Sequence, residues 1–328
     1  MTYLAHASVV ITGASSGIGR ATARAFAEAG ARLTLAARRG EVLDEVAAEC
    51  RALGAEAIAV PTDVTSAEAV HALARAAEEA WGGIDVWVND AGVGAVGALP
   101  DVPLDVHRQV LEVNLMGALH GAYAALPVFL RQGRGVLVNV VSMGAWAPMP
   151  YAAAYTASKF GLRGLSASLR QELAPHPRIH VCGVFPSMID TPGLQHGANL
   201  SGKTVDPGFY LYAPERVARA VVGVARRPRA EVAVGFPSGW ARFGYGVAPL
   251  PTEAMIGLVA RRAMHRASPA PRVEGAVMQP IPEGTGASGG WLDRPGAVEA
   301  GRANGMALAA AGAALALGAL AWASSRRA

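Results

Sequence analysis

The stretch Val9-Val10-Ile11-Thr12-Gly13-Ala14-Ser15-Ser16-Gly17-Ile18-Gly19 decides the fold of this chain. It begins with four β-branched residues, which are typical of a buried strand, and passes through three glycines into a helical pattern. Glycine lets the backbone approach a ligand closely, and a helix N-terminus offers unpaired N–H groups to an anion. The pattern predicts a pyrophosphate site, and a strand-to-helix turn that binds nothing is the alternative. The residues assigned to this site are Gly13, Ser15, Ser16, Gly17, Ile18 and Gly19.

Strand and helix patterns alternate from this loop to about residue 235. Strands are expected at Ser8 to Thr12, Arg32 to Ala36, Glu56 to Pro61, Ile84 to Asn89, Gly135 to Val141, Ile179 to Phe185 and Glu231 to Gly235. Helices are expected at Ile18 to Ala29, Glu41 to Leu53, Ser66 to Trp81, Pro103 to Gln132, Ala152 to Leu173 and Pro214 to Arg226. This alternation predicts an α/β fold with a doubly wound parallel sheet (Rossmann type), with ligands beyond the carboxyl ends of the strands.

The second expected strand ends Leu35-Ala36-Ala37-Arg38-Arg39, without an acidic residue. A site for NAD usually carries an acid there, whereas arginine can pair with the 2′-phosphate of NADP(H). We therefore assign Arg38 to NADP(H), with Ser15 and Arg39 as helpers; a surface arginine pair is the alternative. After the third strand, Asp63 and Val64 are assigned to the adenine edge, although Asp63 could instead only cap the next helix.

Tyr155 and Lys159 lie four residues apart on an expected helix, and therefore on the same face. A fixed ammonium beside a phenol favours the phenolate and lowers its pKa, which makes the tyrosine a better acid or base near neutral pH. Ser142 ends an expected strand, so its hydroxyl can reach the same crevice and donate a hydrogen bond to a substrate oxygen.

Taken together, these motifs make residues 6–236 resemble the short-chain dehydrogenase/reductase family. The matching elements are the Thr12 to Gly19 loop, Asp63, the turn Asn89-Asp90-Ala91-Gly92, Asn114 with Ser142, and the Tyr155 to Lys159 pair. The resemblance implies an oxidoreductase that moves a hydride between NADP(H) and a carbonyl or alcohol carbon.

The resemblance also implies a role for each catalytic residue. Tyr155 would be the general acid/base and Ser142 the donor to the substrate oxygen. Lys159 would hold the nicotinamide ribose, and Asn114 would complete a water-mediated proton relay. Further cofactor contacts are implied for Asn89, Ala91, Gly92, Tyr155, Lys159, Pro186, Ile189 and Thr191.

Two positions depart from the family pattern. Asp90 replaces the second Asn of the turn, and its carboxylate can still accept backbone hydrogen bonds. Ser187 replaces a glycine after Pro186, which would strain the backbone if that position needs a positive φ.

Beyond this catalytic domain (1–236), we expect a helical appendage over 237–266, with its helix from Thr252 to Arg266. Residues 267–303 are rich in Pro, Gly, Ala and Ser and are expected to be a flexible linker. A hydrophobic helix is expected over 304–325, whose apolar run of about 19 residues suits a membrane anchor. A helix docked on protein and a disordered tail are the alternatives.

Residues Met188 to Ala213 are expected to cover the substrate. Their large apolar side chains are Met188, Leu194, Leu200, Phe209, Tyr210, Leu211 and Tyr212. An apolar lipid-like, steroid-like or fatty substrate is the hypothesis, against a small polar ketone.

Composition narrows the possible partners. The chain is 52% hydrophobic with a net charge of +4, and no basic block predicts nucleic-acid binding. Cys50 and Cys182 have no metal-ligand spacing, so no metal is expected. No signal peptide is expected, so the domain is expected on the cytoplasmic side of a membrane, or otherwise in the cytoplasm. The family resemblance implies a homodimer or homotetramer. The rival functions are a non-catalytic NADP-binding sensor or scaffold and a membrane-associated assembly factor.

Overall fold

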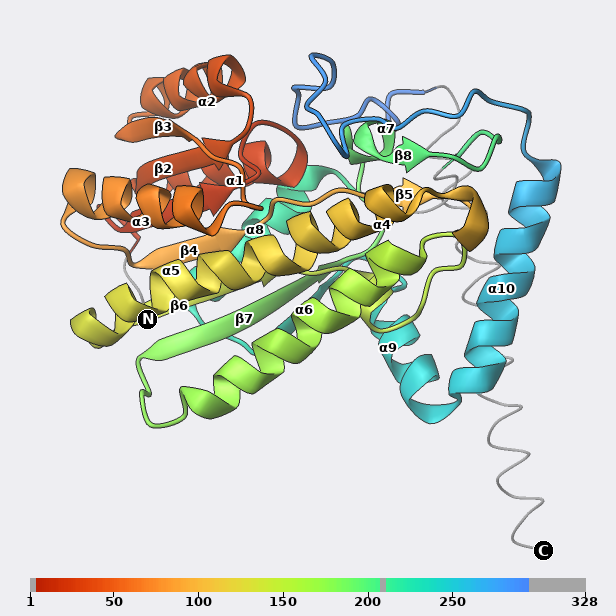
Figure 1. Ribbon diagram of the computed structural model, residues 1–328. Coiled ribbons are helices and arrows are strands. Elements are labelled where there is room, and N and C mark those ends of the chain that lie inside the picture. Colours follow the sequence, from red (N-terminus) through yellow and green to blue (C-terminus); the bar gives the residue numbers. More distant parts are fainter. Residues whose placement is uncertain (1–3, 207–210, 295–328) are drawn as a thin grey trace, which may run out of the picture.

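The computed structural model describes residues 4–206 and 211–294, and its centre is a parallel sheet of seven strands (Figure 1). The strand order is β3-β2-β1-β4-β6-β7-β9, which confirms the doubly wound α/β fold. The order reverses between β1 and β4, so a ligand crevice is expected beyond their carboxyl ends. The strands are β1 (Ser8–Thr12), β2 (Arg32–Ala37), β3 (Ala57–Pro61), β4 (Val86–Asn89), β6 (Gly135–Val140), β7 (Ile179–Pro186) and β9 (Glu231–Val234).

Helices cover both faces of the sheet because successive strand residues point to opposite sides. Val9 and Ile11 face one apolar cluster with α1, α2 and α8, and Val10 faces a second with α3, α5 and α6. The bounds are α1 (Gly17–Glu28), α2 (Gly40–Ala52), α3 (Ala67–Trp81), α5 (Gly117–Gln132), α6 (Ala153–Glu172) and α8 (Pro214–Arg226).

The helix expected from Pro103 to Gln132 is not regular throughout. It consists of α4 (Leu104–Leu111), a π-helical turn (Glu112–Met116) and α5. Among the residues described, this is also the one helix long and apolar enough to cross a membrane. Since 56% of its apolar window is buried against the domain, we regard it as a core helix.

Several short elements were not predicted. They are the two-stranded sheet of β5 (Ala95–Val96) and β8 (Ala198–Asn199), and the helices α7 (Gly193–His196) and α9 (Ser238–Val247). The expected appendage helix is α10 (Pro249–Arg266), which packs on α9 at one side of the domain (Figure 1).

Most of the segment expected as a flexible linker is bonded to the domain in the structure. Residues 268–292, here called the strap, begin with backbone pairing to the β8 region and then lie over the edge of the sheet beside α7 (Figure 1). The strap has few large apolar side chains, but charged side chains of the domain bond its backbone. Residues 295–303 of the expected linker and the expected hydrophobic helix at 304–325 lie outside the described residues.

Candidate active site

The glycine-rich loop has the close packing that its sequence predicts. Gly13 and Gly17 have φ values of +73° and +58°, which disfavour any larger residue. A Cβ atom at Gly13 would lie 2.8 Å from the Ala91 backbone, and one at Gly19 would collide with the Gly13 carbonyl oxygen. The loop therefore presents bare backbone to the crevice at the start of α1.

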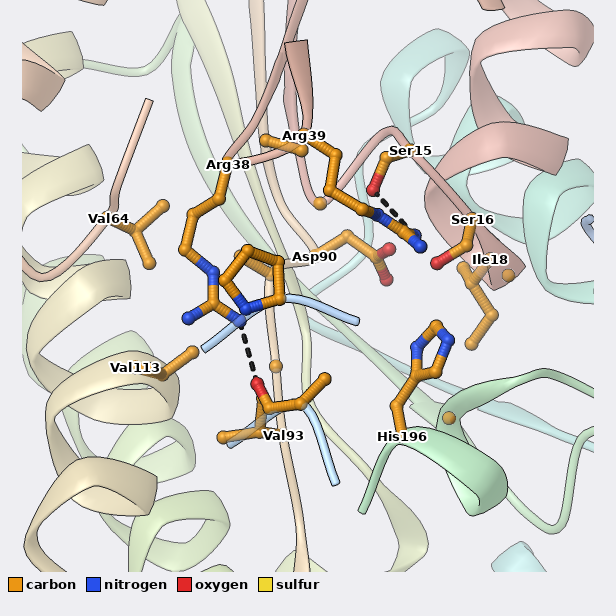
Figure 2. A pocket seen from close by; sticks show the side chains of 18 of the residues that line it. Ser15, Ser16, Ile18, Arg38, Arg39, Val64, Asp90, Val93, Val113 and His196 are labelled. Carbon is orange, nitrogen blue, oxygen red and sulfur yellow. Dashed lines mark hydrogen bonds between the residues drawn. The ribbon is translucent and has the colours of Figure 1, made fainter. Parts of the chain in front are cut away.

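A cavity of about 220 Å³ lies at this edge of the sheet (Figure 2). Gly17 and Ile18, in the first turn of α1, line it, and Ser16 makes no side-chain cap there. Since that turn also carries no acidic residue, the helix dipole favours an anion. The predicted residues that line the cavity are Gly13, Ser15, Ser16, Gly17, Ile18, Arg38, Asp63, Val64, Ala91, Gly92 and Thr191.

Arg38 and Arg39 flank this cavity from the end of β2 (Figure 2). Arg39 Nη2 donates to Ser15 Oγ at 3.2 Å, so the expected helpers lie together. In the part of the chain that the structure describes, neither guanidinium forms an ion pair with a carboxylate. Burial, followed by the charges of Arg38 and Arg20, lowers the pKa of Arg39. Two guanidinium groups without a carboxylate partner among the described residues, close to a helix N-terminus, fit a ligand with several phosphates.

Asp63 also lines the cavity, but its Oδ1 accepts from the backbone N and the hydroxyl of Thr65 at 2.9 and 2.8 Å. The carboxylate thus holds its own turn. Ser66, and not Asp63, caps α3 by accepting from Ala69 N at 3.2 Å. Asp63 therefore does not cap the helix, and its place on the cavity wall is compatible with a contact to the nucleotide.

Six predicted cofactor residues do not line the cavity, namely Gly19, Asn89, Tyr155, Lys159, Pro186 and Ile189. The side chain of Asn89 is buried, where it accepts from Trp87 Nε1 at 2.8 Å and donates to Asn139 Oδ1 at 2.9 Å. It joins β4 to β6 instead of facing a ligand. Pro186 and Ile189 belong to β7 and to the apolar core, respectively.

Asn114 lies in the π-helical turn and is 1% exposed. Its amide accepts from Val93 N at 2.8 Å, and it donates to Val93 O at 2.9 Å and to Ser158 Oγ at 3.0 Å. A wider helical turn re-aims a side chain, and such turns are frequent at functional sites. Asn114 therefore fixes the loop after β4 against α6.

Tyr155, Lys159 and Ser142 lie together, as predicted. Lys159 Nζ is 5.7 Å from the centre of the Tyr155 ring and donates to Val140 O at 3.1 Å. A Cβ atom built on Gly144 would be 3.4 Å from Ser142 Oγ and 3.5 Å from Tyr155 Cε1. One built on Gly92 would be 3.8 Å from Lys159 Nζ, so Gly92 joins the cavity to the catalytic residues.

The ionisable groups here influence one another. Burial raises the pKa of Tyr155, and a hydrogen bond with Ser142 opposes the rise. The expected lowering of this pKa by Lys159 was therefore wrong. Burial lowers the pKa of Lys159 to about 8, while the Asp90 carboxylate acts in the opposite direction. Burial also raises the pKa of Asp90 to about 7, against the effects of Lys159 and the Gly19 N–H. Shifted pKa values in a cleft are typical of catalytic sites.

Two residues of the site, Asp90 and Ser158, were not assigned a role from sequence. Asp90 was treated as a tolerated departure, yet it accepts from the Gly19 backbone, as expected for a carboxylate there, and also faces Lys159. Ser158 connects Asn114 to the Tyr155 backbone, and a serine within a helix gives no sequence signal for that. Ser187 causes no strain, because the non-glycine residues with positive φ in the described ranges are His6 and Tyr151.

Comparison with known proteins agrees with this geometry. The family model for short chain dehydrogenase matches residues 7–199. An uncharacterized oxidoreductase of Bacillus subtilis, YxnA, is 33% identical over 275 residues, which cover 82% of this chain and 77% of that protein. The chain therefore belongs to the short-chain dehydrogenase family and is an oxidoreductase of that family.

Solved structures with the same fold contain either nucleotide. An alcohol dehydrogenase from Thermococcus sibiricus, complexed with 5-hydroxy-NADP, has a TM-score of 0.62 at 29% identity, over 70% of this chain and 96% of that one. A short-chain dehydrogenase/reductase from Burkholderia phymatum, in complex with NAD, has a TM-score of 0.66 at 26% identity, over 83% and 99%. The fold alone does not select the nucleotide.

Proposed function

We propose that this chain is an NADP(H)-dependent oxidoreductase that interconverts a carbonyl group and an alcohol on an apolar substrate. The observation that carries the choice of NADP(H) is the arginine pair at the end of β2. Arg38 and Arg39 face the cavity without a carboxylate partner among the described residues, and a 2′-phosphate would supply the missing anion.

The residues present fit this nucleotide. The loop and the first turn of α1 would hold the pyrophosphate, Arg38 the 2′-phosphate and Lys159 the nicotinamide ribose. When bound, the nicotinamide supplies or accepts the hydride. Tyr155 donates its phenolic proton to the substrate oxygen during reduction, and Ser142 stabilises that oxygen by donating a hydrogen bond. Asn114 and Ser158 hold the helix that carries Tyr155 in place.

An apolar substrate is favoured by the surroundings of Tyr155. The tyrosine packs against a buried cluster that contains Val102, Val106 and Leu200. Leu200 comes from the segment expected to cover the substrate, whereas Phe209 and Tyr210 lie outside the described residues. Displacing water from such a surface favours a hydrocarbon chain at about 25 cal/mol per Å².

The deciding experiment measures NADPH and NADH oxidation with aldehydes and ketones of rising chain length. We expect NADPH to be preferred and kcat/KM to rise with chain length. Preference for NADH would contradict the role of the arginine pair. A preference for small hydrophilic ketones would contradict the apolar substrate, and binding of NADPH without turnover on any compound would favour a sensor.

We also propose that residues 304–325 tether the enzyme to a membrane, with the domain on the cytoplasmic side. The support is the sequence, which has no charged residue from Ala303 to Ser325. Full-length protein should remain with membranes during detergent-free fractionation, and recovery in the soluble fraction would contradict the tether.

The proposed homodimer or homotetramer is supported by apolar side chains on the outer face of α5. Tyr123, Leu130 and Leu119 are 70%, 45% and 37% exposed in the single chain. Light scattering of the purified protein should give a multiple of the chain mass of 33.6 kDa, and a monomer would contradict the assembly.

A further inference from the structure

The strap is fixed to the domain at both ends. At its start, Asn199 and Val273 exchange backbone hydrogen bonds, and Ala270 N donates to Gly202 O at 3.0 Å. At its end, the strap meets Asp190, a residue just beyond β7 that is 1% exposed. These two attachments hold the middle of the strap over the carboxyl edge of the sheet.

The Asp190 carboxylate holds the second attachment through four hydrogen bonds from the strap. It accepts from Ser288 Oγ at 2.9 Å, from Gly289 N and Trp291 N at 3.0 Å each, and from Leu292 N at 3.2 Å. Hydrogen bonds to a buried charged group are stronger than those between neutral groups. The attachment is therefore firm, and it uses Asp190, which was not itself assigned to the nucleotide although its neighbours Ile189 and Thr191 were.

The middle of the strap bonds the donors that the nucleotide requires. Gly17 N, at the start of α1, donates to Gly286 O at 3.0 Å. Arg38 donates to Ala276 O at 2.8 Å and to Met278 O at 3.2 Å.

Arg39 and Arg20 complete this pattern. Arg39 donates to Ile281 O and Glu283 O at 3.1 Å each, and Arg20 donates to Thr285 O at 2.7 Å. Backbone carbonyl oxygens of the strap thus stand where phosphate oxygens would be bound.

The strap also reaches the catalytic residues. Val277 is fully buried, in the same apolar cluster against which Tyr155 and Met278 pack. The cavity left beside the strap, about 220 Å³, is smaller than the roughly 300–1,000 Å³ of sites for drug-sized ligands. A dinucleotide needs more space than the 220 Å³ that remains, so the strap and the nucleotide cannot both occupy their places.

We propose that residues 276–286 of the strap are an internal competitor for the nucleotide, held by the same donors. This rests on the proposed function, which assigns those donors to NADP(H). Nucleotide binding exchanges strap carbonyls for phosphate oxygens at Gly17, Arg38 and Arg39, while Asp190 keeps residues 288–292 attached. Only the fraction of molecules with the strap displaced can bind, so the apparent Kd of any dinucleotide equals the intrinsic Kd divided by that fraction.

The first test is hydrogen–deuterium exchange on the full-length wild-type protein, with and without saturating NADP⁺. We expect peptides that cover residues 276–286 to exchange faster with NADP⁺, while residues 288–292 stay protected. Slower exchange over 276–286 would mean that the strap closes over the nucleotide, and unchanged exchange would mean that it does not move. Either result overturns the proposal.

The second test compares two matched substitutions by nucleotide fluorescence titration. Val277→Asp puts a charge into the buried cluster and should release the strap. Val273→Asp puts the same charge on the strap at a side chain that is 45% exposed. We expect Val277→Asp to lower the Kd of NADPH and of NADH by the same factor, about tenfold, and Val273→Asp to change neither.

The outcomes separate the two proposals. If the wild type binds nucleotide and Val277→Asp binds it with the same Kd, the competitor proposal alone is overturned. If only Val277→Asp binds nucleotide, the competitor proposal is strongly supported. Failure of both proteins to bind either nucleotide overturns the proposed function together with the competitor. If Val277→Asp does not fold, the exchange experiment on the wild type decides.

Discussion

The nucleotide half and the catalytic half of the site satisfy their polar groups differently. In the nucleotide half, Gly17 and Arg38 donate to the carbonyls of a segment more than 200 residues away in the chain. In the catalytic half, Asn114 and Lys159 bond groups of adjacent core elements. The first set of donors can exchange partners, whereas the second is already organised for one reaction.

The largest expected effect comes from the catalytic half. Tyr155→Phe removes the proton donor without changing the glycine-rich loop, so kcat should fall about 10²- to 10⁴-fold. The Kd of NADPH, measured by fluorescence, should stay within about twofold. Tyr123→Phe, at an exposed tyrosine, is the control and should keep full activity. Full turnover by Tyr155→Phe would contradict the assignment.

In the nucleotide half, Gly19→Ala should act through packing. The new Cβ would collide with the Gly13 carbonyl oxygen and lie 2.9 Å from Asp90 Oδ2. We expect a loss of about 1–3 kcal/mol in the free energy of unfolding, together with weaker nucleotide binding. Gly223→Ala, in α8 with open space around it, should instead stabilise by up to about 1 kcal/mol. Denaturant titration gives both values, and equal signs would refute the packing argument.

Arg38→Ala tests the choice of nucleotide. Loss of a charge-assisted contact with a 2′-phosphate, about 1.5–3 kcal/mol, should raise the Kd of NADPH about 10- to 100-fold. NADH lacks that phosphate, and because Arg38 also donates to the strap at Ala276 O and Met278 O, the Kd of NADH should stay the same or fall. Arg32→Ala, at the other end of β2, is the control and should not alter the ratio of the two Kd values. A parallel loss for both nucleotides would mean that Arg38 does not read the 2′-phosphate.

Asp90→Asn tests the connection between the nucleotide half and the catalytic half of the site. Asp90 lines the cavity and also raises the pKa of Lys159. Without the carboxylate, the pKa of Lys159 should fall below its wild-type value of about 8. The ammonium is then lost at lower pH, so the alkaline fall of kcat/KM should move down by about one pH unit. A pH profile from 6 to 10 measures this, and an unmoved or raised limb would show that Asp90 does not act on Lys159.

Much of the fold follows from local pattern. The seven expected strands occur within about two residues of their predicted ends, because β-branched runs and helical periodicity suffice to define them. The π-helical turn at Glu112–Met116 could not be predicted, since the apolar pattern continues through it.

The candidate site shows the same contrast between residues that a local motif defines and residues whose role depends on tertiary contacts. Residues within motifs, such as Tyr155, Lys159 and the glycines, were placed correctly relative to one another. Asn89 was assigned to the nucleotide, although Trp87 and Asn139 bond its side chain inside the core. The strap was missed because its own composition resembles a linker, and the charges that order it belong to Arg38, Arg39 and Asp190, far away in sequence.

The position of the strap after the last strand of the sheet orders events during synthesis. The ribosome releases β9, the last strand of the sheet, well before it releases Leu292. At roughly 5–20 residues per second, the interval is about 3–12 s. A nascent enzyme therefore has its nucleotide site before it has the strap, and a nucleotide present in the cell can reach that site first.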